Sequence, residues 1–391
     1  MRISHRLIGL MSSAMMACLL LLAPAVSAQV FRPGGDLLQP GFTTQDLEHG
    51  AKLFGFDEMQ RAIAEEMLED YFARFAVGVE QMSLILRAAE REFQETRDVA
   101  IWNDFRDRSR AFEQRKDQIT RVLLDDLRLI LSPQQEALWP RYERDLRRMA
   151  TIDEGGLVSG ETVDLVALLD ELGIESDERS AIAQVEDQYV TELDRALVRR
   201  NRVYEDTTDR AFERFSTEGF GDFDAVMEYF GKLLEDAMVE AVQVRDINLR
   251  YAGIIGRGLP YESGRKFQRR FNELCYPRVY RAGPTDRAFE AILAFDDLTE
   301  EQREQVLGQR ERYEQSRERL DANWARAIAT QEEERDVMRV MGIEPSTDAT
   351  RAARTARRGL DRRAYEQVLL VLNEDQASRL PPPVMRDRGD D

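Results

Sequence analysis

The stretch FDEMQRAIAEEMLEDYFARFAVGVEQMSLILRAAEREFQET, residues 56–96, indicates how the chain folds. Its large apolar residues recur at steps of three, four or seven positions: Ile63, Met67, Tyr71, Phe75, Val79, Met82, Leu86 and Phe93. This spacing places them on one face of an α-helix, whereas a half-buried strand would alternate every second residue. Proline is absent from the stretch, and it is also absent between Pro140 and Pro260 and between Pro284 and Pro345. Because proline breaks helix interiors, these gaps predict an all-α protein built from long helices.

One pattern recurs three times along the chain, at intervals of about 120 residues. In each copy an apolar residue is followed after four positions by Gln or Glu, then directly by Arg, and ten residues later by Tyr. The members are Phe56, Gln60, Arg61 and Tyr71 in the first copy, Ile174, Glu178, Arg179 and Tyr189 in the second, and Leu298, Gln302, Arg303 and Tyr313 in the third. We interpret each copy as a short leading helix, two long helices and a short closing helix. Each long helix carries a single apolar stripe, so we expect the two to fold back as an antiparallel hairpin with coiled-coil-like packing.

The repeat predicts three tandem helical units. They cover residues 44–155, 156–283 and 284–380, preceded by a linker at 29–43 and followed by a polar, disordered tail at 381–391. In the first unit we expect the long helices at roughly 58–97 and 100–130, and the later hairpins should turn at 216–222 and 342–346. The glycine-rich segment 253–258 is expected to be a flexible turn before a helix that starts at Pro260.

Helix-start signals punctuate these units. In Leu298-Thr299-x-x-Gln302, the Thr299 side chain can cap the first backbone amides while Gln302 reaches back to form a capping box. The same arrangement is expected where Asp57 precedes Gln60. Relaxed forms of the full motif are Leu131, Ser132 and Gln135, and Leu372, Asn373 and Gln376. Gly55 and Gly173 stand where a short leading helix should end in a left-handed residue.

The N-terminal sequence is typical of an export signal. Arg2 and Arg6 precede an apolar run, and the small residues Val26 and Ala28 predict cleavage after Ala28. The apolar run continues beyond Cys18, which argues against a lipid-modified cysteine there. No later stretch approaches the roughly 20 apolar residues that a transmembrane helix requires. We therefore expect a periplasmic or otherwise exported protein without a membrane span.

Composition argues against several function classes. The chain has 74 acidic and 55 basic residues, a net charge of -19, whereas nucleic-acid binding needs a concentrated cationic surface. It has two His and two Cys, and after signal cleavage only His49 and Cys275 would remain. These are too few for a Cys/His zinc site, and no nucleophile motif accompanies His49. We expect no catalytic, cofactor-binding or metal site and no enzymatic activity. Cys275 is either a buried thiol or a bridge between subunits.

A cationic stripe lies near the C-terminus. Its members recur at helical spacing: Arg351, Arg354, Arg357, Arg358 and Arg362. One interpretation is a face that binds client proteins or polyanions. The other is a solvated helix face whose arginines pair with neighbouring acids such as Asp361.

The export signal, the helical pattern and the Leu-Thr-x-x-Gln signals together resemble the periplasmic LTxxQ-motif family, which includes Spy-like and CpxP-like proteins. Leu298, Thr299 and Gln302 match that motif in full, and the chain looks like three such units in tandem. The resemblance implies an envelope protein whose helical surface holds unfolded or partly folded clients without ATP. The match departs from the family in charge, since family chaperones present a cationic concave surface and this chain is strongly acidic.

The sequence therefore predicts a non-enzymatic, chaperone-like holder or adaptor for other exported proteins. The alternative is a structural scaffold or spacer that self-associates or binds one fixed partner.

Overall fold

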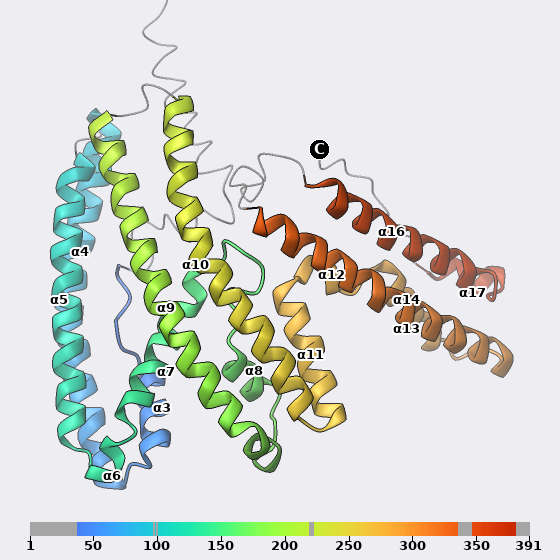
Figure 1. Ribbon diagram of the computed structural model, residues 1–391, viewed down its shortest axis with the longest axis horizontal. Helices are drawn as coiled ribbons and strands as arrows, with labels where there is room; N and C mark the ends of the chain where they lie inside the picture. Colours follow the sequence, from blue (N-terminus) through green and yellow to red (C-terminus); the bar gives the residue numbers. More distant parts are fainter. Residues whose placement is uncertain (1–36, 97, 99–100, 219–222, 335–345, 381–391) are drawn as a thin grey trace, which may run out of the picture. The chain divides into compact units, whose positions relative to one another are not determined.

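The computed structural model describes residues 37–96, 98, 101–218, 223–334 and 346–380. The expected signal peptide at 1–28, most of the linker at 29–43 and the tail at 381–391 lie outside this part, as do most of the turns expected at 216–222 and 342–346. Every regular element in the described residues is a helix and none is a strand (Figure 1). The all-α prediction is confirmed for this part of the chain.

The chain divides into two compact units. The first comprises Met1–Gly155 and Glu186–Glu240, and the second comprises Gly156–Val185 and Ala241–Asp391. Two long helices contribute residues to both units, namely α9 (Ser176–Glu218) and α10 (Phe223–Gly258).

The first unit contains a pair of long helices, α4 (Glu58–Thr96) and α5 (Ile101–Leu129). The shorter helix α3 (Thr44–Phe54) precedes the pair. After it come α6 (Pro133–Glu136), α7 (Trp139–Thr151) and the 3-10 turn η1 (Ile152–Glu154). The Gln60 side chain at the start of α4 bonds to the carbonyl of Ile130, and Tyr71 bonds to Thr120, so α4 and α5 run in opposite directions. Their apolar stripes meet in one core with α3 and α7. Its buried members are Phe42, Leu47, Phe54, Ala64, Leu68, Tyr71, Leu123, Leu127, Trp139 and Tyr142.

The second unit contains α8 (Leu165–Glu171), α11 (Tyr261–Cys275), α12 (Pro277–Tyr280), α13 (Pro284–Leu293), α14 (Glu300–Glu333), α16 (Asp348–Leu369) and α17 (Glu374–Ser378). Hydrogen bonds pair Gln302, early in α14, with Val371 just beyond α16, and Tyr313 with Asp361. These two helices therefore also run in opposite directions, side by side (Figure 1). Phe289, Val306, Tyr313 and Val368 belong to the core between them and α13.

Two glycines end the leading helices as expected. Gly55 follows α3 with φ 66° and Gly173 follows α8 with φ 61°. A side chain in this left-handed region is strained, so glycine is favoured at both positions.

The segment 253–258 is not a turn, contrary to the sequence prediction, because it forms the last turns of α10. In this segment α10 approaches α11 closely at Gly256, and the glycine that this approach requires is Gly264 of α11. A Cβ atom built on Gly264 of α11 would lie 2.2 Å from the carbonyl oxygen of Gly256 in α10. Spacing alone did not distinguish a glycine needed for helix contact from a glycine in a loop.

None of the helices in the described part of the chain is both long and apolar enough to cross a membrane.

Candidate functional site

Two helix-start motifs meet at one end of the α4–α5 pair. The side-chain oxygen of Gln135 accepts a hydrogen bond from the backbone N–H of Ser132 at 2.9 Å and closes the capping box of α6. At the start of α4, the side-chain oxygen of Gln60 accepts from the backbone N–H of Asp57 at 3.3 Å. The side-chain nitrogens of the same two glutamines donate hydrogen bonds to other segments. That of Gln60 donates to the Ile130 carbonyl at 2.8 Å and to Gln135 at 2.9 Å, and that of Gln135 donates to the Phe54 carbonyl at 3.1 Å. We call this reciprocal Gln60–Gln135 pair the first glutamine clasp.

The second unit contains the same arrangement, the second glutamine clasp, formed by Gln302 and Gln376. Each closes its own capping box, with Thr299 and Asn373 as the respective caps. The Gln302 amide donates to the Val371 carbonyl at 2.9 Å and to Gln376 at 3.0 Å, and the Gln376 amide donates to the Asp297 carbonyl at 3.0 Å. The motif leucines, Leu131 in the first unit and Leu298 and Leu372 in the second, pack against the adjacent cores.

The clasp explains why the motif ends in glutamine. One primary amide supplies an acceptor for the capping box and two N–H donors for the neighbouring segment, and a carboxylate supplies no donor. Glu178 occupies this position in the middle copy. Each clasp therefore links three segments by hydrogen bonds: the residues just before the first long helix of its pair, the start of that helix, and the residues that follow the second long helix.

Replacing Gln302 by glutamate is expected to lower the free energy of unfolding of the second unit by about 1–2 kcal/mol, because the capping acceptor stays while the Val371 carbonyl loses its donor. Urea unfolding followed by circular dichroism measures the change. Gln367→Glu is the matched control, since Gln367 is exposed on α16 and the residue one turn before it is Arg363 rather than an acid. Equal stability of the two variants would contradict the clasp as a stabilising contact.

The cationic stripe on α16 is only partly a surface feature. Arg351, Arg358 and Arg362 are exposed, Arg354 is half-buried, and Arg351 forms an ion pair with Asp348. Arg357 is 4% exposed, so its inclusion in a client-binding or polyanion-binding face was wrong. Its side chain instead belongs to a buried charge network.

Arg357 is held by groups from two helices. Its Nε donates to Asp321 at 2.7 Å, its Nη1 pairs with Asp361, and its Nη2 donates to the Tyr313 hydroxyl at 3.3 Å. Burial opposes the charge of this guanidinium, yet Tyr313, Asp361 and Asp321 together raise the pKa of Arg357 above its usual value.

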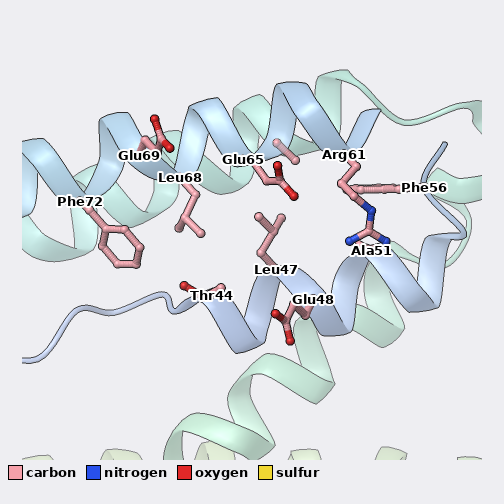
Figure 2. Close-up of a pocket in the computed structure, with 11 residues that line it drawn as sticks. Thr44, Leu47, Glu48, Ala51, Phe56, Arg61, Glu65, Leu68, Glu69 and Phe72 are labelled. Atoms are coloured by element: carbon pink, nitrogen blue, oxygen red, sulfur yellow. The ribbon is translucent and has the colours of Figure 1, made fainter. Parts of the chain in front are cut away.

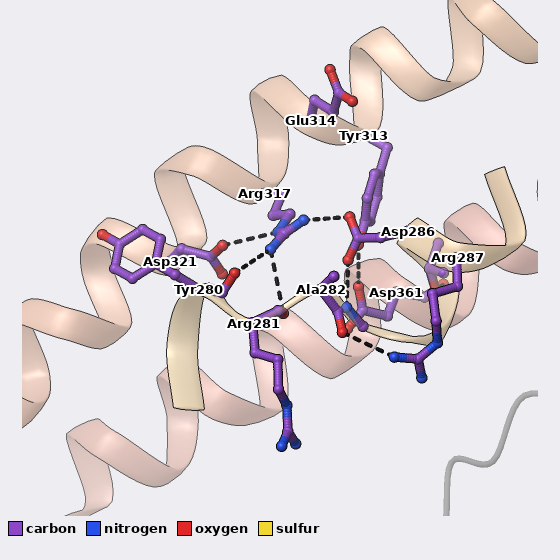
Figure 3. Close-up of polar contacts among 12 residues, drawn as sticks. Tyr280, Arg281, Ala282, Asp286, Arg287, Tyr313, Glu314, Arg317, Asp321 and Asp361 are labelled. Carbon is purple, nitrogen blue, oxygen red and sulfur yellow. Dashed lines mark hydrogen bonds and ion pairs between the residues drawn. The ribbon is translucent and has the colours of Figure 1, made fainter. Parts of the chain in front are cut away.

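Arg317 extends the network toward α13. Figure 3 shows its guanidinium between Asp286 and Asp321, with the Tyr280 carbonyl accepting from Nη2 at 2.9 Å. Burial raises the pKa of Asp321, even though Arg357 and Arg317 both act to lower it. Asp286 also accepts from the Gly283 amide at 2.6 Å, at the start of α13. Since these charges satisfy one another inside the unit, the network is suited to holding α13, α14 and α16 together.

His49 is half-buried between α3 and α7. Its Nε2 lies 3.1 Å from Asp145 of α7, and its ring stacks on that of Tyr142. Burial opposes ionisation of Asp145, but the contact with His49 and the charge of Arg148 hold the pKa of that carboxyl below its usual value. His49 therefore connects α3 to α7.

Cys275 is a free, buried thiol at the end of α11. Its sulfur packs so closely on Gly160 that a Cβ there would lie 2.9 Å away. Burial is the main reason that the pKa of this thiol is raised. The buried-thiol interpretation therefore agrees with the structure.

A groove that the sequence did not reveal lies between α3 and α4, with a volume of about 300 Å³. In Figure 2, Leu47 of α3 and Leu68 of α4 point toward one another across it, and Glu65 points toward Leu47. Its lining is Thr44, Leu47, Glu48, Ala51, Phe56, Arg61, Ala64, Glu65, Leu68, Glu69 and Phe72. Acids are so abundant in this sequence that spacing could not single out these three glutamates.

Within the described residues, no group of three or more His, Cys, Asp or Glu side chains is arranged to hold a metal ion. Comparison of the chain with protein-family models, with curated proteins and with solved structures gave no match. The likeness to the LTxxQ-motif family therefore remains a prediction from the motif residues, and the function must be argued from the geometry above.

Proposed function

We propose that this chain is a non-enzymatic, exported protein that holds other envelope proteins in an unfolded or partly folded state without ATP. The observation that carries the proposal is the glutamine clasp, which occurs in two copies and gives the Leu-Thr-x-x-Gln residues one shared structural role. It supports the resemblance to the LTxxQ-motif family on which the holding function rests.

A threefold repeat of helical hairpins is part of the proposal. The order of a short helix, two long helices and a further helix is found at α3–α6, at α8–α11 and at α13–α17. The three motif tyrosines, Tyr71, Tyr189 and Tyr313, are all buried. Each of the three hairpins would then expose one outer surface of its helix pair to clients.

Exposed leucines supply apolar contact beside each clasp. Leu129 is 82% exposed and Leu370 is 87% exposed, and each directly precedes the residue whose carbonyl the clasp binds. In this proposal, Leu129 and Leu370 contact the exposed apolar segments of a client.

A light-scattering assay tests the holding function. The purified protein, at an equimolar ratio and in low and moderate salt, should slow the aggregation of reduced α-lactalbumin without ATP. The double variant Leu129→Ser with Leu370→Ser should hold less well, because contact with apolar client segments is reduced while the buried core is untouched. No effect of the unsubstituted protein on aggregation would overturn the proposal. A defined oligomer without any such effect would support the scaffold alternative.

A further inference from the structure

The groove between α3 and α4 joins an apolar floor to an acidic margin. Leu47, Ala51, Ala64 and Leu68 are buried and form the floor, and Phe72 is half-buried at one end. A volume of about 300 Å³ is at the small end of the range for ligand pockets, so the groove suits a few side chains of a chain segment better than a large cofactor.

The acidic margin consists of Glu48 from α3 and Glu65 and Glu69 from α4. All three are exposed, and none forms an ion pair with a residue in the described part of the chain. Glu65 and Glu69 are one helical turn apart, where like charges repel. The next acid along α4 differs, because Asp70 pairs with Arg74 at 2.6 Å.

Charge complementarity identifies the occupant. A cationic side chain placed between Glu65 and Glu69 would relieve their repulsion, and an apolar neighbour could lie on Leu47 and Leu68. The net charge of -19 attracts cationic segments over a distance and repels anionic ones. Arg61 lies at the other end of the groove, next to Phe56, and would disfavour a second cation there.

We infer that this groove binds short client segments in which an arginine or lysine adjoins large apolar residues. The inference deepens the proposed function by naming the chemistry of the client, and it rests on that function for the identity of the occupant as a client. The third copy of the repeat, at 284–380, lacks the groove chemistry, since Leu307 stands where the repeat would place Glu65.

A binding experiment with a defined probe tests the inference. The probe is a fluorescein-labelled peptide of twelve residues in which leucine and arginine alternate, and its fluorescence anisotropy is titrated with the full-length protein. Two control peptides replace every arginine by glutamine or every leucine by serine. Both controls should bind more weakly than the probe, because each removes one half of the complementarity.

Matched variants locate the binding. Glu65→Gln with Glu69→Gln should weaken binding of the probe roughly three- to tenfold, as expected for two solvent-exposed charge pairs. Glu66→Gln with Glu80→Gln changes the net charge equally on exposed positions of α4 outside the groove lining, and should change binding less than about twofold. Equal weakening by the two pairs would show general charge attraction and overturn the inference.

The two proposals fail in different ways. If the protein slows α-lactalbumin aggregation but does not prefer the leucine–arginine peptide, the groove inference is wrong and the holding function stands. If the peptide binds and the groove variants weaken it while aggregation is unaffected by the protein, the groove stands as a peptide site and the holding function is wrong.

Discussion

Replacing Arg357 by alanine is expected to lower the free energy of unfolding of the second unit by about 3–5 kcal/mol at neutral pH. The substitution leaves the carboxylates of Asp321 and Asp361 in a buried site with Arg317 as the remaining cation of the network. Urea unfolding of the full protein, with hydrogen exchange of peptides from α14 and α16, measures both the size and the location of the loss.

The loss should depend on pH in a defined direction. Burial already raises the pKa of Asp321, and removal of Arg357 raises it further. The folded protein therefore holds the proton of Asp321 more tightly than the unfolded chain does. Below the unfolded pKa of about 4 this preference stabilises the folded state, and the stabilisation is lost as the pH rises through the pKa of the folded state. The penalty of Arg357→Ala should therefore be smaller near pH 4 than at pH 8.

Arg362→Ala is the control, because Arg362 is exposed on the same helix and should change stability by less than about 0.5 kcal/mol. A similar, small effect of both substitutions would show that the buried network contributes little.

Replacing Gly264 by alanine is the second substitution with a large expected effect. The added Cβ would meet the backbone of Gly256 rather than a flexible side chain, so α10 and α11 would have to move apart. Overpacking of this kind costs about 1–3 kcal/mol, and we expect a loss of about 2 kcal/mol after the helix-forming gain of alanine is included.

Gly231→Ala in α10 is the matched control, since a Cβ there meets nothing within 4 Å. It should leave stability unchanged or raise it by up to about 1 kcal/mol. Thermal unfolding followed by circular dichroism compares the two variants. Stabilisation by Gly264→Ala would show that the helices are not held in contact at this glycine pair.

The helices could be predicted well because their signals are local. Apolar periodicity and the Asp57 cap placed the first pair at 58–97 and 100–130, and the structure has it at Glu58–Thr96 and Ile101–Leu129. Capping boxes at Ser132, Thr299 and Asn373 depend on residues three apart, so they too were visible in the sequence.

Contacts between distant residues were not predictable from spacing. Arg357 matched a surface stripe, yet its partner Asp321 lies 36 positions away and on another helix. The groove brings Glu48 of α3 near Glu65 of α4, and no local pattern relates the two. The glutamine clasps were missed for the same reason, although each glutamine was identified as a cap.

The enclosed sulfur of Cys275 gives the protein a built-in reporter of transient opening. A thiol reagent reaches this atom only when the packing around Gly160 and the end of α11 is released. In a chain whose Cys18 is replaced by serine, the labelling rate under native conditions would therefore report how often the second unit opens locally, at a single atom and without a denaturant.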